Sequence, residues 1–349
     1  MPDSRPDAAA LALQPMKQRF ARELVAGEAL TDAFLVKSKE LRLNKNGDPY
    51  LSLVLCDRTG EFDAKVWDQV PELQSQFERD DVIKVQGKLV LFRNRPQLQI
   101  QRLRKLEAHE FDLADFLPAT RADIGALWAE LHGWVEAVDH PQLRRLLLAL
   151  LDDPDIAARL RRAPAAKSLH HAYLGGLLEH ICSLGRAARL LLPNYPWLDG
   201  DLLLAGIILH DLGKIEELEY DRAIVYSTPG QLLGHMILGL ELLREKTRAL
   251  PDFPPALRTL LEHLIISHHG KYEFGSPKLP MFPEALVLHY LDDLDSKLHA
   301  MRASLEQAGE AEWSGYNPSL ERSLLHWQDW LRKQTAPEAA AAASTSLET

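Results

Sequence analysis

The chain has 349 residues, 46 % of them hydrophobic and 26 % charged, and a formal net charge of −10 at pH 7. This length favours two domains, and the composition is ordinary for a globular protein. No window approaches the roughly 18 consecutive apolar residues of a membrane span, which excludes a helical membrane protein. Only two cysteines occur, Cys56 and Cys182, which excludes a disulfide scaffold or a cysteine-rich zinc site. The acidic charge argues against a protein that coats nucleic acid non-specifically.

Residues 1–26 contain Ala and Pro and lack the basic and apolar layout of a signal peptide, so we expect a loose lead-in and a cytoplasmic protein. From 27 to 108, short alternating runs are separated by turn signals. The predicted strands are 33–37, 50–56, 61–67, 82–90 and 97–101, with a short helix after Pro71. Five strands with a helix between the third and fourth predict a small Greek-key barrel of the oligonucleotide-binding (OB) type. A small barrel of another topology is the alternative that this pattern leaves open.

The predicted barrel is the basic part of an acidic chain. Residues 31–106 hold 14 Lys or Arg and 11 Asp or Glu, a net charge of +3, which leaves −13 for the rest. A barrel with this charge suits a single strand of RNA or DNA, tracked by cations and stacked on aromatic rings. The candidate contacts are Lys37, Lys39, Lys45, Lys65, Lys88, Arg93 and Arg95 for phosphates and Tyr50, Trp67 and Phe92 for bases. The alternatives are a solvated basic face and, most of all for Trp67, a place in the barrel core.

From 109 to 335 the apolar residues recur with the period of an α-helix. The predicted helices are 122–138, 142–151, 172–192, 202–210, 231–249, 256–267, 283–305 and 320–332. We therefore expect a β + α protein of two domains, a five-stranded OB-type barrel followed by an all-α domain. The Ala, Ser and Thr run at 336–349 predicts a disordered tail.

A nearly all-apolar helix, 202–209, is followed directly by His210 and Asp211, with Lys214 three residues later. Burying an imidazole and a carboxylate there is costly unless a charged partner meets them. A divalent cation satisfies both, because imidazole nitrogen and carboxylate oxygen are good ligands for Mn, Fe, Co or Zn. The alternative is a histidine that interacts with the helix dipole and an aspartate that caps the next segment.

Further residues of the same types lie along the helical region. His180 shares an apolar helical stripe with Leu177 and Leu184, so it points inward. Additional candidates are His235, the pair His268 and His269, and the carboxylates Asp292 and Asp295. Helical periodicity favours Asp295 over Asp292 as the inward-facing carboxylate.

The order His180, His210-Asp211, Asp292 resembles the HD-domain phosphohydrolases, an all-α superfamily, over about residues 165–300. The segments 170–180 (HHAYLGGLLEH) and 268–277 (HHGKYEFGSP) look like those of YhaM-type 3′-5′ exoribonucleases. That family also joins an N-terminal OB barrel to a C-terminal HD domain.

The resemblance implies metal ligands at His180, His210, Asp211 and Asp292. For a second ion it implies His235, His268 and His269, with Asp211 as the bridge and Lys214 facing the scissile phosphate. We expect Mn first, with Co, Fe, Mg or Zn as alternatives. Asp295 remains a secondary candidate, and His170 and His171 either bind phosphate or cap the helix.

We expect hydrolysis of phosphodiester bonds in single-stranded RNA, or DNA, by metal-activated water without a covalent intermediate. Polarity from 3′ to 5′ and preference for RNA come only from the resemblance. One alternative is a phosphohydrolase of a nucleotide or cyclic dinucleotide, which the attached barrel and the absence of a Gly-Tyr-Pro sequence after His269 disfavour. Another is a catalytically inactive nucleic-acid-binding protein, which the complete set of His and Asp residues disfavours.

Overall fold

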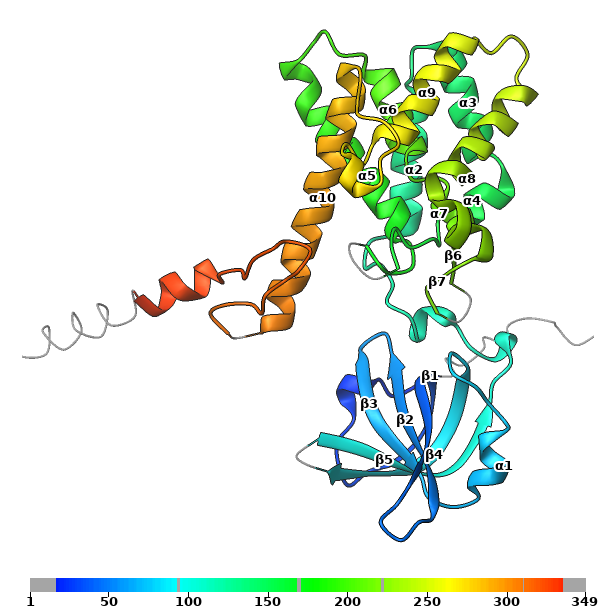
Figure 1. Ribbon diagram of the computed structural model, residues 1–349, viewed down its shortest axis with the longest axis vertical. Helices are drawn as coiled ribbons and strands as arrows, with labels where there is room; N and C mark the ends of the chain where they lie inside the picture. The colour runs from blue at the N-terminus through cyan, green and yellow to red at the C-terminus, as the bar shows by residue number, and fades with distance from the viewer. Residues whose placement is uncertain (1–16, 93–94, 168–170, 221–222, 310, 335–349) are drawn as a thin grey trace, which may run out of the picture. The chain divides into compact units, whose positions relative to one another are not determined.

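The structure is a computed structural model, and it describes residues 17–92, 95–167, 171–220, 223–309 and 311–334. The chain forms two compact units (Figure 1). The first consists of residues 1–119 with 220–223, and the second of residues 120–219 with 224–349.

The first unit ends at Ala119 and not at residue 108, because the segment after the last strand packs on the barrel. The backbone N–H of Arg58 donates to the carbonyl oxygen of Asp115 at 3.1 Å. The Lys17 ammonium lies 5.3 Å from the centroid of the Phe116 ring. These contacts hold residues 108–117 to the barrel.

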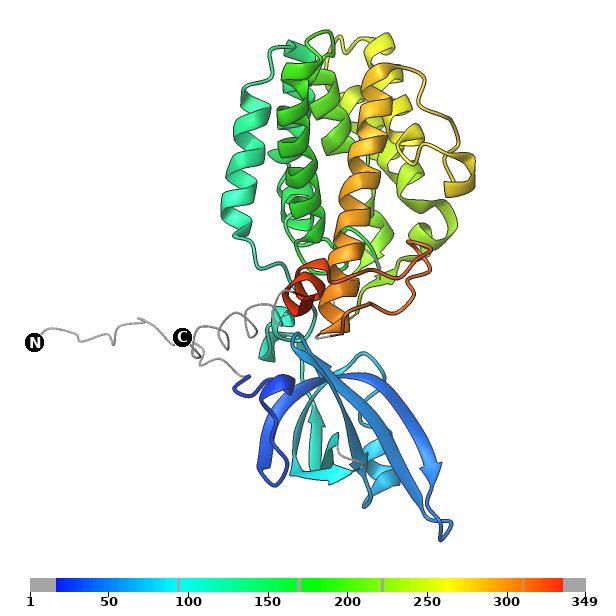
Figure 2. The same cartoon turned by 90° about the vertical axis from the view of Figure 1, so that its left-hand side faces the viewer.

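The first unit contains a closed five-stranded barrel with the strand order β1-β2-β3-β5-β4 (Figure 2). Its strands are β1 (Ala29–Leu43), β2 (Pro49–Asp57), β3 (Gly60–Val66), β4 (Val82–Phe92) and β5 (Arg95–Lys105), with α1 (Val70–Gln74) between β3 and β4. Short 3₁₀ turns flank them at η1 (Ala21–Glu23), η2 (Ala108–Glu110) and η3 (Leu113–Asp115). The β3 and β5 strands pair in parallel and the other neighbours are antiparallel, as in the predicted OB-type barrel.

Alternation along the strands fills the barrel. In β2, Leu51, Leu53 and Leu55 are fully buried and the residues between them are partly exposed. The β1 strand is longer than predicted, because a bulge between Val36 and Ser38 shifts the alternation without ending the strand.

The second unit is an all-α domain with one two-stranded ribbon. Its helices are α2 (Ile124–Glu136), α3 (Pro141–Leu151), α4 (Pro154–Leu160), α5 (Gly176–Leu191), α6 (Gly200–Leu209), α7 (Lys214–Glu217), α8 (Thr228–Ala249), α9 (Pro255–Ser267) and α10 (Pro283–Ala308). The ribbon pairs β6 (Leu218–Glu219) with β7 (Val225–Tyr226), and 3₁₀ turns occur at η4 (Leu192–Asn194) and η5 (Tyr272–Phe274). The sequence patterns predicted neither α4, α7 nor the ribbon.

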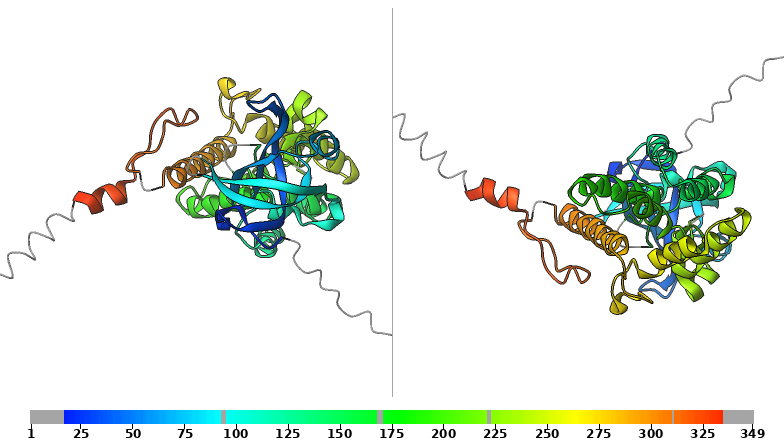
Figure 3. Two further views of the ribbon diagram at one scale, coloured as in Figure 1. Left: turned by 90° about the horizontal axis from the view of Figure 1, so that it is seen from below. Right: turned by 90° about the horizontal axis from the view of Figure 1, so that it is seen from above.

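The α6 helix lies in the middle of this domain and contacts α3, α5, α9 and α10. Figure 3 shows α10, in orange, running along one side of the bundle. Asp199 begins α6 by accepting a hydrogen bond from the Leu202 backbone at 2.9 Å. The sequence of α6 is nearly all apolar because the helix is buried on most sides. His210 and Asp211, which directly follow its last turn, lie in the interior of the domain.

The helix predicted at 320–332 is wrong in its first half. Residues 327–334 are helical, whereas 313–325 fold back on themselves through bridges between Trp313 and Leu325 and between Asn317 and Arg322. The Asn317 amide ties this segment, here called the C-terminal hairpin (residues 313–325), to the Ser304 hydroxyl on α10 at 2.6 Å. The lead-in at 1–16 and the tail at 336–349 lie outside the described residues. Within the described ranges, no helix has the length and apolarity to cross a membrane.

Candidate metal centre

Two groups of potential ligands lie on either side of Asp211. The first consists of His180 on α5, His210 at the end of α6 and Asp292 on α10, and the second of His235 on α8 and His268 and His269 after α9. Within each group the ligand atoms lie within 4.8 Å of one another. Five elements far apart in sequence thus bring together all seven residues that the family resemblance suggested.

Asp211 offers one carboxylate oxygen to each group. Its Oδ2 lies 3.4 Å from His210 Nε2 and 3.9 Å from His180 Nε2. Its Oδ1 lies 3.4 Å from His235 Nε2 and 3.7 Å from His268 Nε2. Asp211 is only 1 % exposed, and Oδ1 has no hydrogen-bond partner among the described residues.

All five histidines of the two groups turn Nε2 inward, because Nδ1 is held from outside. The Nδ1 atoms of His210, His268 and His269 contact backbone carbonyl oxygens at 2.6–2.9 Å. Those of His180 and His235 contact the carboxylates of Asp295 at 2.7 Å and Glu217 at 3.2 Å. Since carbonyl and carboxylate oxygens only accept, each Nδ1 carries a proton, and Nε2 is the ring atom left to bind a cation. At His180, burial alone would lower the pKa, but Asp292 and Asp295 outweigh it and raise that pKa to about 9, so a cation that binds at Nε2 displaces a proton.

Glu217 and two glycines position His235. The Glu217 Oε1 oxygen accepts from both the backbone N–H and the Nδ1 of His235. Gly234, at φ +75°, breaks the helical path within α8 so that both groups face Glu217. Gly213 lets the turn after Asp211 approach α8, because a Cβ there would lie 2.0 Å from the His235 carbonyl oxygen. Glu217 is a residue that the sequence analysis missed, although it follows the His210-Asp211 pair on the same segment.

Asp292 and Asp295 contact opposite nitrogens of the His180 ring. Asp292 Oδ1 lies 3.2 Å from His180 Nε2, on the ligand side of the ring. Asp295 Oδ2 lies 2.7 Å from His180 Nδ1, behind the ring, and also contacts His171 Nε2 at 2.9 Å. Ser183, unremarked in the sequence, donates to the other Asp295 oxygen. Asp295 and His171 therefore orient His180.

Local charges prepare the ionisation states that metal ligands need. Burial alone would raise the pKa of Asp211, but Lys214 and His210 outweigh it and hold that pKa well below its usual range. Burial lowers the pKa of His268 and His269, with help from neighbouring histidines. A deprotonated carboxylate next to neutral imidazoles is the form in which these side chains bind metal.

The donor set fits divalent cations. His180 Nε2 lies 3.4 Å from His210 Nε2, and His235 Nε2 lies 3.5 Å from His268 Nε2. Lone pairs that face each other at these distances are unfavourable without a proton or a cation between them, and the Oδ1 atom of Asp211 likewise lacks a buried partner. Mixed imidazole and carboxylate donors suit transition metals.

A cavity of about 340 Å³ adjoins the centre. Asp211, Lys214, His269 and Asp292 line the side toward the ligands. The Lys214 ammonium lies 2.6 Å from Asp211 Oδ2, so one buried cation already lies where the cavity meets the ligands.

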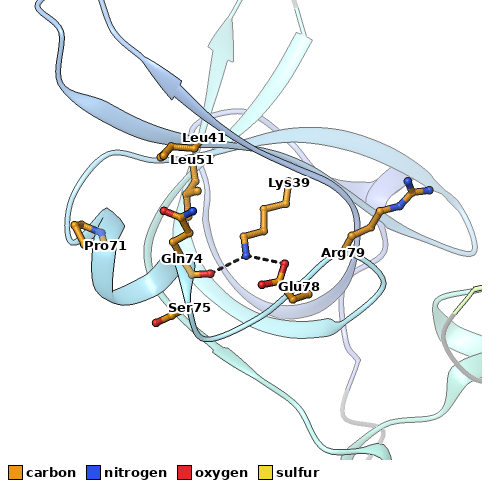
Figure 4. Close-up of a pocket in the computed structure, with 8 residues that line it drawn as sticks. All are labelled: Lys39, Leu41, Leu51, Pro71, Gln74, Ser75, Glu78 and Arg79. Atoms are coloured by element: carbon orange, nitrogen blue, oxygen red, sulfur yellow. Dashed lines mark hydrogen bonds and ion pairs between the residues drawn. The ribbon is translucent and has the colours of Figure 1, made fainter.

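The basic candidates on the barrel divide into three kinds. Lys39 differs from the predicted phosphate contact, because its ammonium binds the carbonyl oxygen of Gln74 and the carboxylate of Glu78 (Figure 4). It also binds the carbonyl oxygen of Phe77. Its side chain is 10 % exposed, and it stabilises the end of α1. Lys37 pairs with Glu61, whereas Lys45 and Lys88 are exposed.

Tyr50 and Trp67 form an aromatic pair on the outside of the barrel. Their ring centroids are 4.6 Å apart with an interplanar angle of 26°, and Trp67 is 44 % exposed. Trp67 is therefore not a core residue, since β3 ends at Val66. The Lys65 ammonium lies 5.7 Å from the Tyr50 ring, and Arg42, which the sequence analysis missed, is paired with Tyr50 across β1 and β2. Phe92 is 53 % exposed, while Arg93, the side chain of Arg95 and His170 lie outside the described residues.

Comparison with known proteins agrees with both units. Residues 35–106 match the model of the OB-fold nucleic acid binding domain, and residues 177–297 match that of the HD domain. The chain is 36 % identical to the 3′-5′ exoribonuclease YhaM of Bacillus velezensis over 290 residues, which cover 82 % of this chain and 91 % of the relative.

Two further relatives with the same printed name are similar to the chain over the same span. The protein of Shouchella clausii is 37 % identical, covering 82 % of this chain and 90 % of the relative. That of Bacillus subtilis is 35 % identical, covering 82 % and 91 %. With an OB barrel, an HD domain and this identity over nearly the full length of its relatives, the chain belongs to the YhaM family of 3′-5′ exoribonucleases.

Proposed function

We propose that the chain is a metal-dependent 3′-5′ exoribonuclease acting on single-stranded RNA. The observation that carries this is the inward convergence of five histidine Nε2 atoms and Asp292 on both oxygens of buried Asp211. This arrangement supports a cation-binding role, because imidazole nitrogens and carboxylate oxygens together are ligands that divalent metals accept. Membership of the exoribonuclease family supplies the reaction class and its polarity.

The seven residues divide into ligands for two cations. His180, His210 and Asp292 would hold one ion, His235, His268 and His269 the other, and Asp211 would be shared between them. Divalent ions so bound lower the pKa of water and polarise phosphoryl oxygen. We propose Mn²⁺, because manganese accepts both carboxylate and imidazole ligands, with Co, Fe, Mg and Zn as the alternatives to test.

We propose that Lys214 contacts the substrate phosphate. Its ammonium is buried against Asp211 and lines the cavity. A fixed positive charge beside the reacting phosphate stabilises the negative charge that develops on its oxygens as the bond to the leaving 3′-oxygen breaks.

We assign the first unit, which contains the predicted barrel domain at 27–108, to RNA binding and the second unit, which contains most of the predicted domain at 109–335, to hydrolysis. The Tyr50 and Trp67 pair offers a stacking surface, and Lys45, Lys65 and Lys88 offer cations for a phosphate backbone. Stacking and phosphate contacts do not distinguish RNA from single-stranded DNA, so DNA is a second substrate to assay. Both cysteines are free thiols, which fits a reducing compartment such as the cytoplasm.

The test is degradation of 5′-labelled single-stranded RNA by the purified chain with Mn²⁺, with and without a chelator. We expect a ladder shortened from the 3′ end that the chelator abolishes. Binding without cleavage in any of the five metals would indicate an inactive binding protein. Hydrolysis of a cyclic dinucleotide with intact RNA would indicate the small-nucleotide alternative.

A further inference from the structure

The cavity beside the candidate metal centre has one wall made of candidate ligands and another made of residues that have no role in binding the cations. Its volume, about 340 Å³, is at the small end of the range of roughly 300–1,000 Å³ for small-ligand sites. It therefore suits one nucleoside better than a longer piece of RNA. Away from the ligands it is lined by Phe274, His289, Asp293, Ser296, Lys297, Ala300, Ser319 and Leu320, of which Asp293 and Lys297 form an ion pair.

Phe274 is an exposed aromatic ring fixed next to a ligand. The ring is 52 % exposed although it lines the cavity. Its backbone carbonyl oxygen accepts from His269 Nδ1 at 2.8 Å, and its own N–H donates to the Lys271 carbonyl oxygen at 3.1 Å. The residue that carries this flat apolar ring is thus hydrogen-bonded directly to His269, one of the candidate metal ligands.

The other walls offer hydrogen-bond acceptors. The Ser296 hydroxyl donates to the Asp293 carbonyl oxygen at 3.1 Å, and the Ser319 hydroxyl donates to the Asn317 side-chain oxygen at 2.7 Å. With its proton engaged, each hydroxyl oxygen is left to accept. Ser319 lies on the C-terminal hairpin, so that hairpin forms one wall of the cavity.

We propose that this cavity binds the 3′-terminal nucleoside of the RNA, with its base stacked on Phe274 and its ribose hydroxyls donating to Ser296 and Ser319. The inference rests on the proposed exoribonuclease function and assigns the substrate end to particular residues. The phosphate on the 5′ side of that nucleoside then lies toward Asp211 and Lys214. Because the cavity holds only the one nucleoside beyond the cleaved bond, we expect the RNA to be shortened by one nucleotide at a time.

The test pairs a variant with a matched substrate. Two RNAs are compared, one ending in adenosine and one ending in an abasic ribose, by kcat/KM for removal of the last residue. For the unmodified chain we expect the abasic end to react roughly 5- to 100-fold more slowly, the range of one base–aromatic stack. Phe274→Ala should react slowly with both ends and lose the difference, and Phe274→Tyr should restore it.

Tyr272→Ala is the matched control. Tyr272 is 63 % exposed, belongs to the same 3₁₀ turn and does not line the cavity. This variant should keep the difference between the two ends. A Phe274→Ala variant that still discriminates against the abasic end would overturn the assignment.

Binding of adenosine 5′-monophosphate to the Mn²⁺-loaded chain separates this inference from the proposed function. We expect Phe274→Ala to weaken that binding 5-fold or more and Tyr272→Ala to leave it unchanged. If the unmodified chain cleaves no RNA but this pattern holds, the cavity assignment stands and the exoribonuclease assignment fails. Equal nucleotide binding by all three proteins would overturn the cavity assignment whether or not RNA is cleaved.

Discussion

The two units bury carboxylates in opposite ways. In the barrel, Asp32 accepts hydrogen bonds from the backbone N–H groups of Gln18, Arg19 and Ala33 at 2.6–2.9 Å. In the helical domain, Asp211 is buried to the same extent, yet its Oδ1 has no hydrogen-bond partner among the described residues. A buried carboxylate whose partners are all backbone groups stabilises the fold. A buried carboxylate oxygen without a hydrogen-bond partner indicates a place where a group outside the chain, such as a cation, can bind.

The largest expected effect is on activity, and it distinguishes Asp211 from Asp32. Asp211→Asn should lower exoribonuclease activity by about 10³-fold or more, since it removes charge and one oxygen ligand from both groups. In the absence of metal it should also lower the free energy of unfolding, because the buried Lys214 ammonium loses the charge of its ion-pair partner. Asp32→Asn should lower the free energy of unfolding by about 1–3 kcal/mol and leave the activity of the folded protein intact.

Single-turnover rates and urea denaturation of the full chain, both in the presence and absence of Mn²⁺, measure these effects. The comparison is broken if Mn²⁺ stabilises Asp211→Asn as much as it stabilises the unmodified chain.

The second-largest effect is expected at Asp295, whose carboxylate contacts His180 Nδ1. Asp295→Asn should weaken Mn²⁺ binding 10- to 100-fold, because an uncharged amide oxygen holds the proton on His180 Nδ1 more weakly than the carboxylate does. Activity should recover at high Mn²⁺, unlike that of Asp211→Asn. Glu306→Gln is the control on the same helix, where Glu306 pairs with Arg302 at the surface. Failure of excess Mn²⁺ to restore Asp295→Asn would make Asp295 a ligand instead.

A smaller effect is expected on the barrel surface. Trp67→Ala should weaken binding of long single-stranded RNA about 5- to 100-fold and leave cleavage of a dinucleotide unchanged. Val25→Ala, which also removes an exposed apolar side chain of this unit, should change neither. Fluorescence anisotropy with labelled RNA measures the affinities, and equal loss for long and short RNA would remove the barrel from substrate binding.

The smallest functional effect concerns one thiol in each unit. Burial raises the pKa of Cys56 to about 11 and that of Cys182 to about 12. A raised pKa means less thiolate at a given pH, so both should resist alkylation at pH 8, and the rate should increase as the pH rises toward 11. Mass spectrometry after iodoacetamide treatment measures this, and activity should be unaffected. Fast alkylation of native Cys182 at pH 8 would contradict its burial.

Periodicity predicted the five strands and the long helices because burial on one face leaves a pattern in the sequence. It failed at 320–326, where the Asn317 and Arg322 bridge turns the chain back and an apolar period arises by chance. The side chains of the candidate metal centre were named by the family resemblance, whereas helical periodicity alone favoured Asp295 over Asp292. The backbone partners of the histidines were predicted by neither. The carbonyl oxygens of Ile207, Ile265 and Phe274 have no side-chain signature, so only coordinates reveal them.

Because of two of those carbonyl contacts, the lengths of the helices α6 and α9 determine where His210 and His268 lie. His210 and His268 each bind the carbonyl oxygen three residues earlier in their own helix, so the helix end itself sets the direction of Nε2. Inserting one residue before either histidine would turn it by about 100° and advance it by about 1.5 Å, although the helix would remain intact. The lengths of these two helices therefore fix the candidate metal centre as much as its side chains do, and substitutions should be tolerated along them far better than insertions or deletions.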